Sequence, residues 1–185
     1  MKTKYLVVLA LLVILGSAAY AVDVDGVVAP GEYPKEAVFD NGNFRLLWKI
    51  IGDKAFMAID AKAPGWVSVG FQPTAVMANA DMIFGFVDAA SKVWAVDAWS
   101  TGMFGPHPAD ASQKGSDNLL SSAGKRTADQ VVFEFSRLLN TGDKLDKIIP
   151  STGSFKIIWA YASNFQFNGS HMKAGSATLN MDGSK

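Results

Sequence analysis

The chain has 185 residues, equal numbers of basic and acidic side chains, and no cysteine. This length suits one domain with a full hydrophobic core, and a chain without a basic excess is an unlikely partner for nucleic acid or an anionic membrane surface. The absence of cysteine excludes a thiol nucleophile, cysteine-ligated zinc, an iron–sulfur cluster and covalent attachment of haem through C-x-x-C-H.

The first 21 residues have the pattern of a signal peptide. Lys2 and Lys4 form a positive n-region, residues 5–15 are an unbroken apolar run, and Ala19 to Ala21 supply an A-x-A cleavage pattern. The run is too short to span a bilayer comfortably, although an uncleaved N-terminal anchor is an alternative, and no later segment resembles a transmembrane helix. We therefore expect an exported, periplasmic or extracellular protein whose mature domain covers residues 22–185.

Short alternating segments separated by turn signals make up the first half of the mature chain. The first of them is expected to be an edge strand with a turn. An alanine-rich loop interrupts the pattern at residues 75–80. The expected strands cover residues 23–33, 44–51, 55–60, 65–71, 82–87 and 93–99.

The second half of the chain is less regular. Residues 100–130 are rich in Gly, Pro, Ser, Asp and Asn, which predicts an irregular segment with at most one short strand near Leu119. Residues 136–140 are expected to form a helical turn or a loop. The remaining strands are expected at residues 131–135, 156–161 and 177–181. Short strands with hardly any helical periodicity predict an all-β fold, an antiparallel, immunoglobulin-like β-sandwich.

Two side chains together indicate a metal centre. Met77 stands in a loop whose neighbours Ala75, Ala78 and Ala80 are too small to fill space, so a flat ligand could lie close to the backbone. His171 follows an aromatic and glycine-rich connection. Taken singly, a methionine or a loop histidine is more often structural. As a pair, a thioether and an imidazole are a suitable axial set for haem iron, and filling both axial positions favours electron transfer over dioxygen chemistry.

Other polar residues have weaker claims to a functional role. His107 lies in a proline-flanked loop, where an ordinary exposed residue is expected. Several aspartates lie on turns or strand ends and are expected to form turns or be solvated rather than to act as a catalytic pair. These are Asp60, Asp81, Asp88 and Asp97. Asp81 is expected to brace the Met77 loop through backbone amides.

The sequence resembles the DOMON family over nearly the whole mature chain. The similarity is to the cytochrome b type found in cellobiose dehydrogenase and in haem-binding subunits of the ethylbenzene dehydrogenase class. It rests on GWVSVGF (65–71), MANADMIFGFVD (77–88), VWAVDAW (93–99), FEFSRLLNTGDKLDKII (133–149), IIWAYA (157–162), His171 and Gly175. The resemblance implies a β-sandwich that grips a non-covalent haem b at one end, with Met77 and His171 as axial ligands.

A haem slot also needs apolar walls, and several side chains near the two ligand loops are candidates. They are Phe71, Val76, Met82, Phe84, Trp99, Met103, Phe165 and Phe167. Met82 is in phase with Phe84 and Phe86, so it is expected to pack whether or not haem is present.

The resemblance leaves two functions open. We find no flavin or molybdenum domain in this sequence, so the first is an electron carrier that is not itself an enzyme. Its partner would be a separate redox protein or a membrane-bound electron-transfer subunit. Some family members instead look like sugar- or catechol-binding modules, and exposed tryptophans could stack on a sugar, although Trp159 lies in an apolar run and is expected in the core.

Overall fold

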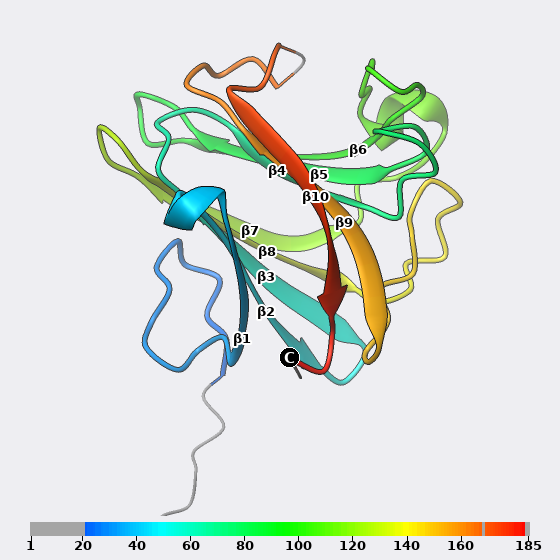
Figure 1. Ribbon diagram of the computed structural model, residues 1–185, viewed down its shortest axis with the longest axis horizontal. Coiled ribbons are helices and arrows are strands. Elements are labelled where there is room, and N and C mark those ends of the chain that lie inside the picture. Colours follow the sequence, from blue (N-terminus) through cyan, green and yellow to red (C-terminus); the bar gives the residue numbers. More distant parts are fainter. Residues whose placement is uncertain (1–20, 168, 184–185) are drawn as a thin grey trace, which may run out of the picture.

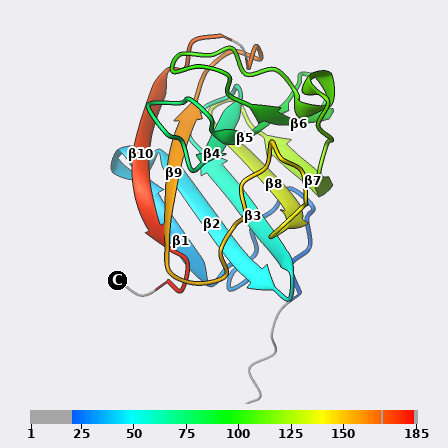
Figure 2. The ribbon, with the colours of Figure 1, turned by 90° about the vertical axis from the view of Figure 1, so that its right-hand side faces the viewer.

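The computed structural model describes residues 21–167 and 169–183, and it consists of two β-sheets packed face to face (Figures 1 and 2). Each sheet has five strands, and all of the pairings are antiparallel. This arrangement confirms the predicted β-sandwich. Residues 1–20, which hold almost all of the predicted signal peptide, lie outside the described residues. In the part described, no helix is long and apolar enough to cross a membrane.

The first sheet has the strand order β1-β2-β3-β8-β7. A short 3₁₀ helix, η1 (Asp40–Gly42), joins its first two strands. The strands are β1 (Lys35–Phe39), β2 (Phe44–Ile51), β3 (Lys54–Ala61), β8 (Val131–Leu138) and β7 (Leu119–Arg126).

The second sheet has the order β10-β9-β4-β5-β6, so the C-terminal strand lies at one edge. A second 3₁₀ helix, η2 (Asp110–Gln113), lies in the long connection between β6 and β7. The strands are β10 (Lys173–Asn180), β9 (Ser154–Tyr161), β4 (Val67–Phe71), β5 (Asp81–Val87) and β6 (Val93–Trp99).

Strand alternation fills the space between the sheets with apolar side chains. Val67, Val69 and Phe71 of β4 share one face, as the sequence predicts, and this face points into the core, where none of them is exposed. Gly85 of β5 leaves room for the opposite sheet, because a Cβ atom there would lie 2.2 Å from the ring of Phe133. The two sheets therefore approach each other most closely where β5 faces β8.

The outer face of the second sheet is also apolar. Met82, Phe84 and Phe86 alternate with the core residues of β5, and they form a second buried cluster with Trp66 and Ala160. The outer face of an antiparallel sheet usually meets water, yet Met82 and Phe84 are only 4% and 2% exposed. Loops at one end of the sandwich cover this face, and they form the frame of the candidate site.

Three expected boundaries are wrong. Residues 23–33 form no strand, because backbone amides from Asp25 to Val27 donate hydrogen bonds to the buried Glu134 carboxylate instead of to a neighbouring strand. The one short strand that we allowed near Leu119 is the eight-residue strand β7, which extends to Arg126. Strand β8 continues to Leu138, which pairs with Lys54, where we expected a helical turn.

Candidate functional site

The Met77 loop is a tight turn supported by its own backbone. The amide of Thr74 donates to the carbonyl of Ala78 at 2.9 Å, and the amide of Ala78 donates to Ala75 at 2.8 Å. Val76 has a φ of +51°, a left-handed conformation that costs a non-glycine residue about 1–3 kcal/mol. The structure thus holds Met77 at the tip of a strained turn, where no packing requirement selects a methionine.

A second segment holds this turn in place. The amide of Met77 donates to the carbonyl of Met103 at 3.4 Å, and the amide of Asn79 donates to Ser100 at 2.9 Å. Ser100 in turn donates its amide to Ala80 at 2.9 Å. The start of the β6–β7 connection therefore forms a backing layer for the Met77 loop.

His171 lies at the opposite wall, in the connection between β9 and β10. The next residue, Met172, is fixed by a hydrogen bond from its amide to the carbonyl of Tyr161 at 2.8 Å. The His171 side chain is exposed at the rim.

Met77 and His171 line the same two cavities on the outer face of the second sheet. The volumes are about 520 and 300 Å³. Met82 and Ala160 form a common floor, and Phe104 contributes to the wall of both. Cavities of about 300 to 1,000 Å³ with mostly apolar walls are typical ligand sites. The fold therefore brings a thioether and an imidazole, from distant parts of the chain, to one apolar site.

The sequence comparison identifies the family. The model of the DOMON domain matches residues 40–162. The chain belongs to the DOMON family. It is 33% identical over 135 residues to the DBH-like monooxygenase protein 1 of Mus musculus, which covers 72% of this chain and 21% of that protein. It is 31% identical over 122 residues to the MOXD1 homolog 2 of Drosophila melanogaster, covering 65% of this chain and 15% of that one.

This DOMON domain thus spans about a fifth or less of the length of the curated relatives that it matches. Among solved structures, the cytochrome b domain of pyranose dehydrogenase from Coprinopsis cinerea matches with a TM-score of 0.58 and 12% sequence identity. The match covers 81% of this chain and 83% of that one. At this identity, the comparison shows a shared fold.

Half of the predicted wall residues of the DOMON domain line the two cavities. Met82 lines both, Val76 lines the larger, and Phe84 and Phe167 line the smaller. Phe165 instead lines a third cavity beside them. The prediction for these residues used only their nearness to the ligand loops in sequence, and strand alternation supports it for Met82 and Phe84.

Three predicted wall residues line none of these cavities. Phe71 points between the sheets, where its ring stacks on Phe155 with a centroid separation of 5.5 Å. Trp99 lies under the ammonium group of Lys147, 4.7 Å from the ring centroid. The Met103 side chain is 49% exposed, and this residue serves the Met77 loop through its backbone carbonyl.

His107 belongs to the site, although we expected an ordinary exposed loop residue. It lines the smaller cavity together with Met77 and His171, and its ring lies 5.8 Å from that of Phe84. Burial, and then repulsion by His171, lower the pKa of His107. A neutral second imidazole therefore stands beside the proposed axial pair. The flanking prolines were the only sequence signal, and they gave no indication that the loop folds back over β5.

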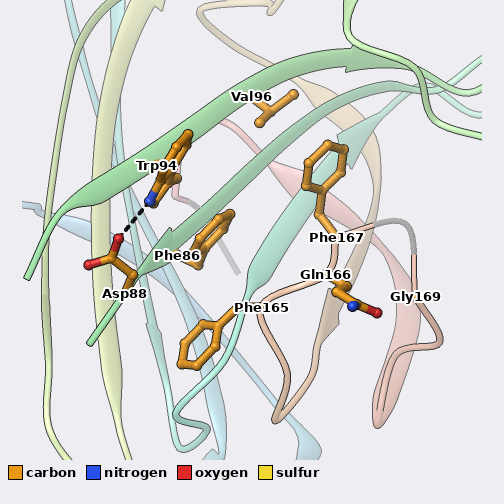
Figure 3. Close-up of a pocket in the computed structure, with 8 residues that line it drawn as sticks. All are labelled: Phe86, Asp88, Trp94, Val96, Phe165, Gln166, Phe167 and Gly169. Carbon is orange, nitrogen blue, oxygen red and sulfur yellow. Dashed lines mark hydrogen bonds between the residues drawn. The ribbon is translucent and has the colours of Figure 1, made fainter. Parts of the chain in front are cut away.

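The third cavity has aromatic walls (Figure 3) and adjoins the smaller of the other two. Its volume is about 690 Å³, and Phe167 and Gly169 line both this cavity and the smaller one. The indole N–H of Trp94 donates to Asp88 at 3.0 Å, and the ammonium group of Lys92 lies 3.7 Å from an indole ring centroid of the same residue. Figure 3 shows Phe86 and Phe165 on the same side of the sheet as Trp94.

Two predictions about the aspartates are wrong. Asp81 does not brace the Met77 loop, because its Oδ2 accepts hydrogen bonds from the Arg137 guanidinium and the Lys147 amide, both at 2.8 Å. Asp97 was expected to be solvated but is only 3% exposed, and Asp81 is not exposed at all. Burial raises the pKa of Asp81 to about 6 and that of Asp97 to about 7. No local pattern in the sequence indicates that an arginine from the other sheet meets this strand.

Proposed function

We propose that this DOMON domain binds haem b non-covalently and transfers electrons, with Met77 and His171 as the axial ligands. The proposal is carried by one observation, that these two side chains line the same two apolar cavities. A Met/His pair stabilises the reduced state of haem iron and therefore raises its reduction potential. With both axial positions filled by the protein, dioxygen finds no open site, so the domain is a carrier and not itself an enzyme.

The residues around the pair fit a large, flat and mostly apolar group. Met82 and Phe84 supply a buried apolar floor, and the small Ala160 leaves room above the sheet. Lys156 lies on the rim of the larger cavity, where its ammonium group could pair with a haem carboxylate. The protein would hold the group, exclude water from its faces and leave one edge near the exposed rim at His171.

The edge of the haem near His171 would be the place where electrons pass to or from a partner. An exposed rim allows electrons to pass to a protein that docks beside His171. We infer that the partner is a separate redox protein or a membrane-bound electron-transfer subunit, and that the exchange takes place outside the cytoplasm, where the predicted signal peptide would direct the chain.

Absorption spectroscopy tests the proposal. Protein purified from a haem-competent host, or mixed with hemin, should show a low-spin, six-coordinate spectrum, and acidic organic solvent should extract the haem. Met77→Ala should fold normally, lose low-spin six-coordination and bind haem more weakly. His171→Ala should lose most of the haem.

His107→Ala is the matched control, because it removes the other imidazole of the smaller cavity. It should change the spectrum little. Protein that stays colourless after hemin is added would overturn the proposal. Loss of haem from His107→Ala, with an unchanged spectrum for His171→Ala, would move the axial role to the segment of residues 100–130.

The aromatic third cavity favours a second candidate, a haem-free module that binds a carbohydrate or another small ligand. Trp94 and Phe165 are 42% and 39% exposed there, and aromatic rings stack on sugars. The case is weaker, because Lys92 already lies over the Trp94 ring and Asp88 already accepts its N–H. Titration with oligosaccharides separates the two functions. Binding that is lost in Trp94→Ala but kept in His171→Ala would support this candidate.

A further inference from the structure

Three carboxylates meet between the sheets, on the opposite side of β5 from the two cavities. Asp81 of β5, Asp97 of β6 and Asp146 of the β8–β9 connection place one oxygen atom each within 4.8 Å of the other two. Two oxygens bound to a single Ca²⁺ ion at about 2.3–2.6 Å can be no more than about 5 Å apart. The spacing is therefore compatible with one shared ion.

A fourth carboxylate, on η2, is buried beside these three. Asp110 is not exposed, and neither of its carboxylate oxygens has a hydrogen-bond partner among the described residues. The charges that repel it most are those of Asp97 and Asp146. A desolvated carboxylate with no partner is costly, and proteins normally avoid it by pairing the charge or by binding a metal.

The same lack of partners recurs around the cluster. Asp81 and Asp97 each use Oδ2 as an acceptor, whereas their Oδ1 atoms are buried without a partner in the described part of the chain. Asn118, whose amide donates to Asp97 at 2.9 Å, also has a buried and unpartnered Oδ1. Several side-chain oxygen atoms from separate elements are thus buried near one another without a hydrogen-bond partner among the described residues.

The charge of this cluster is not balanced by side chains. Arg137 lies 2.8 Å from Asp81 and 3.8 Å from Asp146, and within residues 21–167 and 169–183 these are the ion pairs found in the cluster. Lys147 contributes its backbone amide, while its ammonium group lies over Trp99. One guanidinium thus pairs with Asp81 and Asp146, while Asp97 and Asp110 have no ion pair among the described residues. Burial, followed by mutual repulsion, raises the pKa of Asp110 to about 8, as expected when positive charge is missing.

We propose that Asp81, Asp97 and Asp146 bind one divalent cation, that the carboxylate of Asp110 contributes beside them, and that this cation is Ca²⁺. All of the candidate ligands are oxygen atoms, including the free Oδ1 of Asn118, which suits a hard cation and not a transition metal. Ca²⁺ accepts irregular sets of six to eight oxygens, whereas Mg²⁺ keeps several water molecules and demands octahedral geometry. A buried cluster with four carboxylates therefore suits Ca²⁺ better than Mg²⁺.

The ion would join four separate elements. It would tie β5 and β6 to η2 and to the β8–β9 connection, which otherwise repel one another at this point. This site lies apart from the proposed haem ligands and does not depend on haem binding. Its role is structural, and its failure would leave the proposed electron transfer standing.

Calcium titration of the full chain tests the proposal. Chelator-treated protein should bind one Ca²⁺ ion by isothermal titration calorimetry. At a free concentration one hundred times the dissociation constant, Tm should rise by about 5–10 °C. No saturable binding, together with equal Tm values in calcium and in chelator, would overturn the proposal. An equal shift with Mg²⁺ at the same concentration would overturn the assignment to calcium.

Asp110→Asn provides a readout that an ordinary buried hydrogen-bonding residue would not give. Calcium affinity should fall at least about tenfold. In chelator, the variant should be as stable as the parent or more stable, because a buried carboxyl group without a partner is gone, whereas in calcium it should be less stable. Lower stability in both conditions, with unchanged calcium affinity, would contradict a ligand role.

Asp97→Asn gives the same test if Asp110→Asn does not fold, since an asparagine can still accept the hydrogen bond from the Asn118 amide. Asp53→Asn is the matched control. Asp53 is an exposed turn residue between β2 and β3, and its carboxylate is not part of the group formed by Asp81, Asp97 and Asp146. This variant should match the parent in both conditions. A change in calcium affinity in Asp53→Asn equal to that in Asp97→Asn would show that the titration reports general charge, and would overturn the assignment.

Discussion

Strand β5 separates two sites of opposite chemistry. On its outer face Met82 and Phe84 form the floor of apolar cavities. The thioether of Met77 and the imidazole of His171, the two possible metal donors, come from loops at the rim. On its inner face Asp81 joins a dry cluster of carboxylates held in place by Arg137. One face is suited to a large ligand with soft donors, and the other to a small, hard cation.

The difference teaches how one strand can serve both purposes. Because successive side chains point to opposite faces, Asp81 and Met82 are neighbours in sequence but lie on opposite sides of the sheet. The outer site is closed by loops that rest on apolar side chains, outside the space between the two sheets. The inner site lies between two paired sheets, where each unpaired charge affects the stability of the whole fold.

The largest expected effect contrasts Trp159, a core residue that also borders the larger cavity, with Phe84 of the smaller cavity. Trp159 stacks on Phe39 between the sheets with a centroid separation of 5.4 Å, so Trp159→Asp should abolish folding by burying a carboxylate in the core. Phe84→Asp should lose haem at a lower cost to the fold than Trp159→Asp, because it changes the floor of the smaller cavity on the outer face of the sheet. Circular dichroism and haem absorbance measure the two effects. Equal loss of folding in both variants would break the distinction between the faces.

Arg137→Leu tests the inner face. Removing the guanidinium leaves four carboxylates without a side-chain cation in contact among the described residues, and breaking a buried ion pair from one side costs about 3–5 kcal/mol. Urea unfolding in chelator should show this loss, and added calcium should recover part of it. The control is Arg45→Leu, whose pair with Glu36 is exposed and should contribute about 1 kcal/mol or less. Similar losses in the two variants would argue against a charge-dependent inner site.

A smaller contrast compares two neighbours on β5. Ile83 is fully buried between the sheets, so Ile83→Ala should cost about 2–5 kcal/mol in the free energy of unfolding. Met82→Leu conserves volume on the outer face and should cost less than about 1.5 kcal/mol while leaving the haem spectrum unchanged. Denaturant melts and absorption spectra check both. A changed spectrum in Met82→Leu would show that Met82 ligates or contacts the iron.

The smallest expected effect concerns a hydrogen bond outside both sites, between Tyr161 and Asp40. The Tyr161 hydroxyl donates a hydrogen bond to Asp40, and this bond lowers the pKa of that aspartate. A lowered carboxyl pKa stabilises the fold above its unfolded value, near 3.9, and this stability is lost as the pH falls through the folded value. Tyr161→Phe should therefore raise the pKa of Asp40 in an NMR titration and weaken the loss of Tm on acidification. An unchanged pKa would contradict this assignment.

Local patterns in the sequence predicted the parts of the fold that depend on alternation. The order of apolar and small residues predicts which side chains of β4 share a face and that Met82 and Phe84 lie on the same face of β5. It also predicts the loop position of Met77. These patterns could not show that the outer face of β5 is covered by loops. Alternation separates two faces but does not say which of them has a second layer above it.

Contacts between distant segments could not be predicted in this way. Asp81 meets Arg137 from the other sheet, and His107 meets Phe84 through a loop that returns over β5. Each residue looks ordinary in its own sequence neighbourhood, so both were expected to be solvated or exposed. In the same way, backbone amides between Asp25 and Val27 are captured by Glu134, which removes the strand that the local pattern indicates.

The position of β10 at the edge of its sheet has a kinetic consequence. Within the described residues this strand pairs with β9 alone, and the connection between them carries His171. Edge segments and the loops beside them open at a lower free-energy cost than strands paired on both sides. We therefore expect a ligand held by His171 to enter and leave while the sandwich stays folded. The rate at which such a ligand is loaded should then be set by the opening of this edge and not by global unfolding.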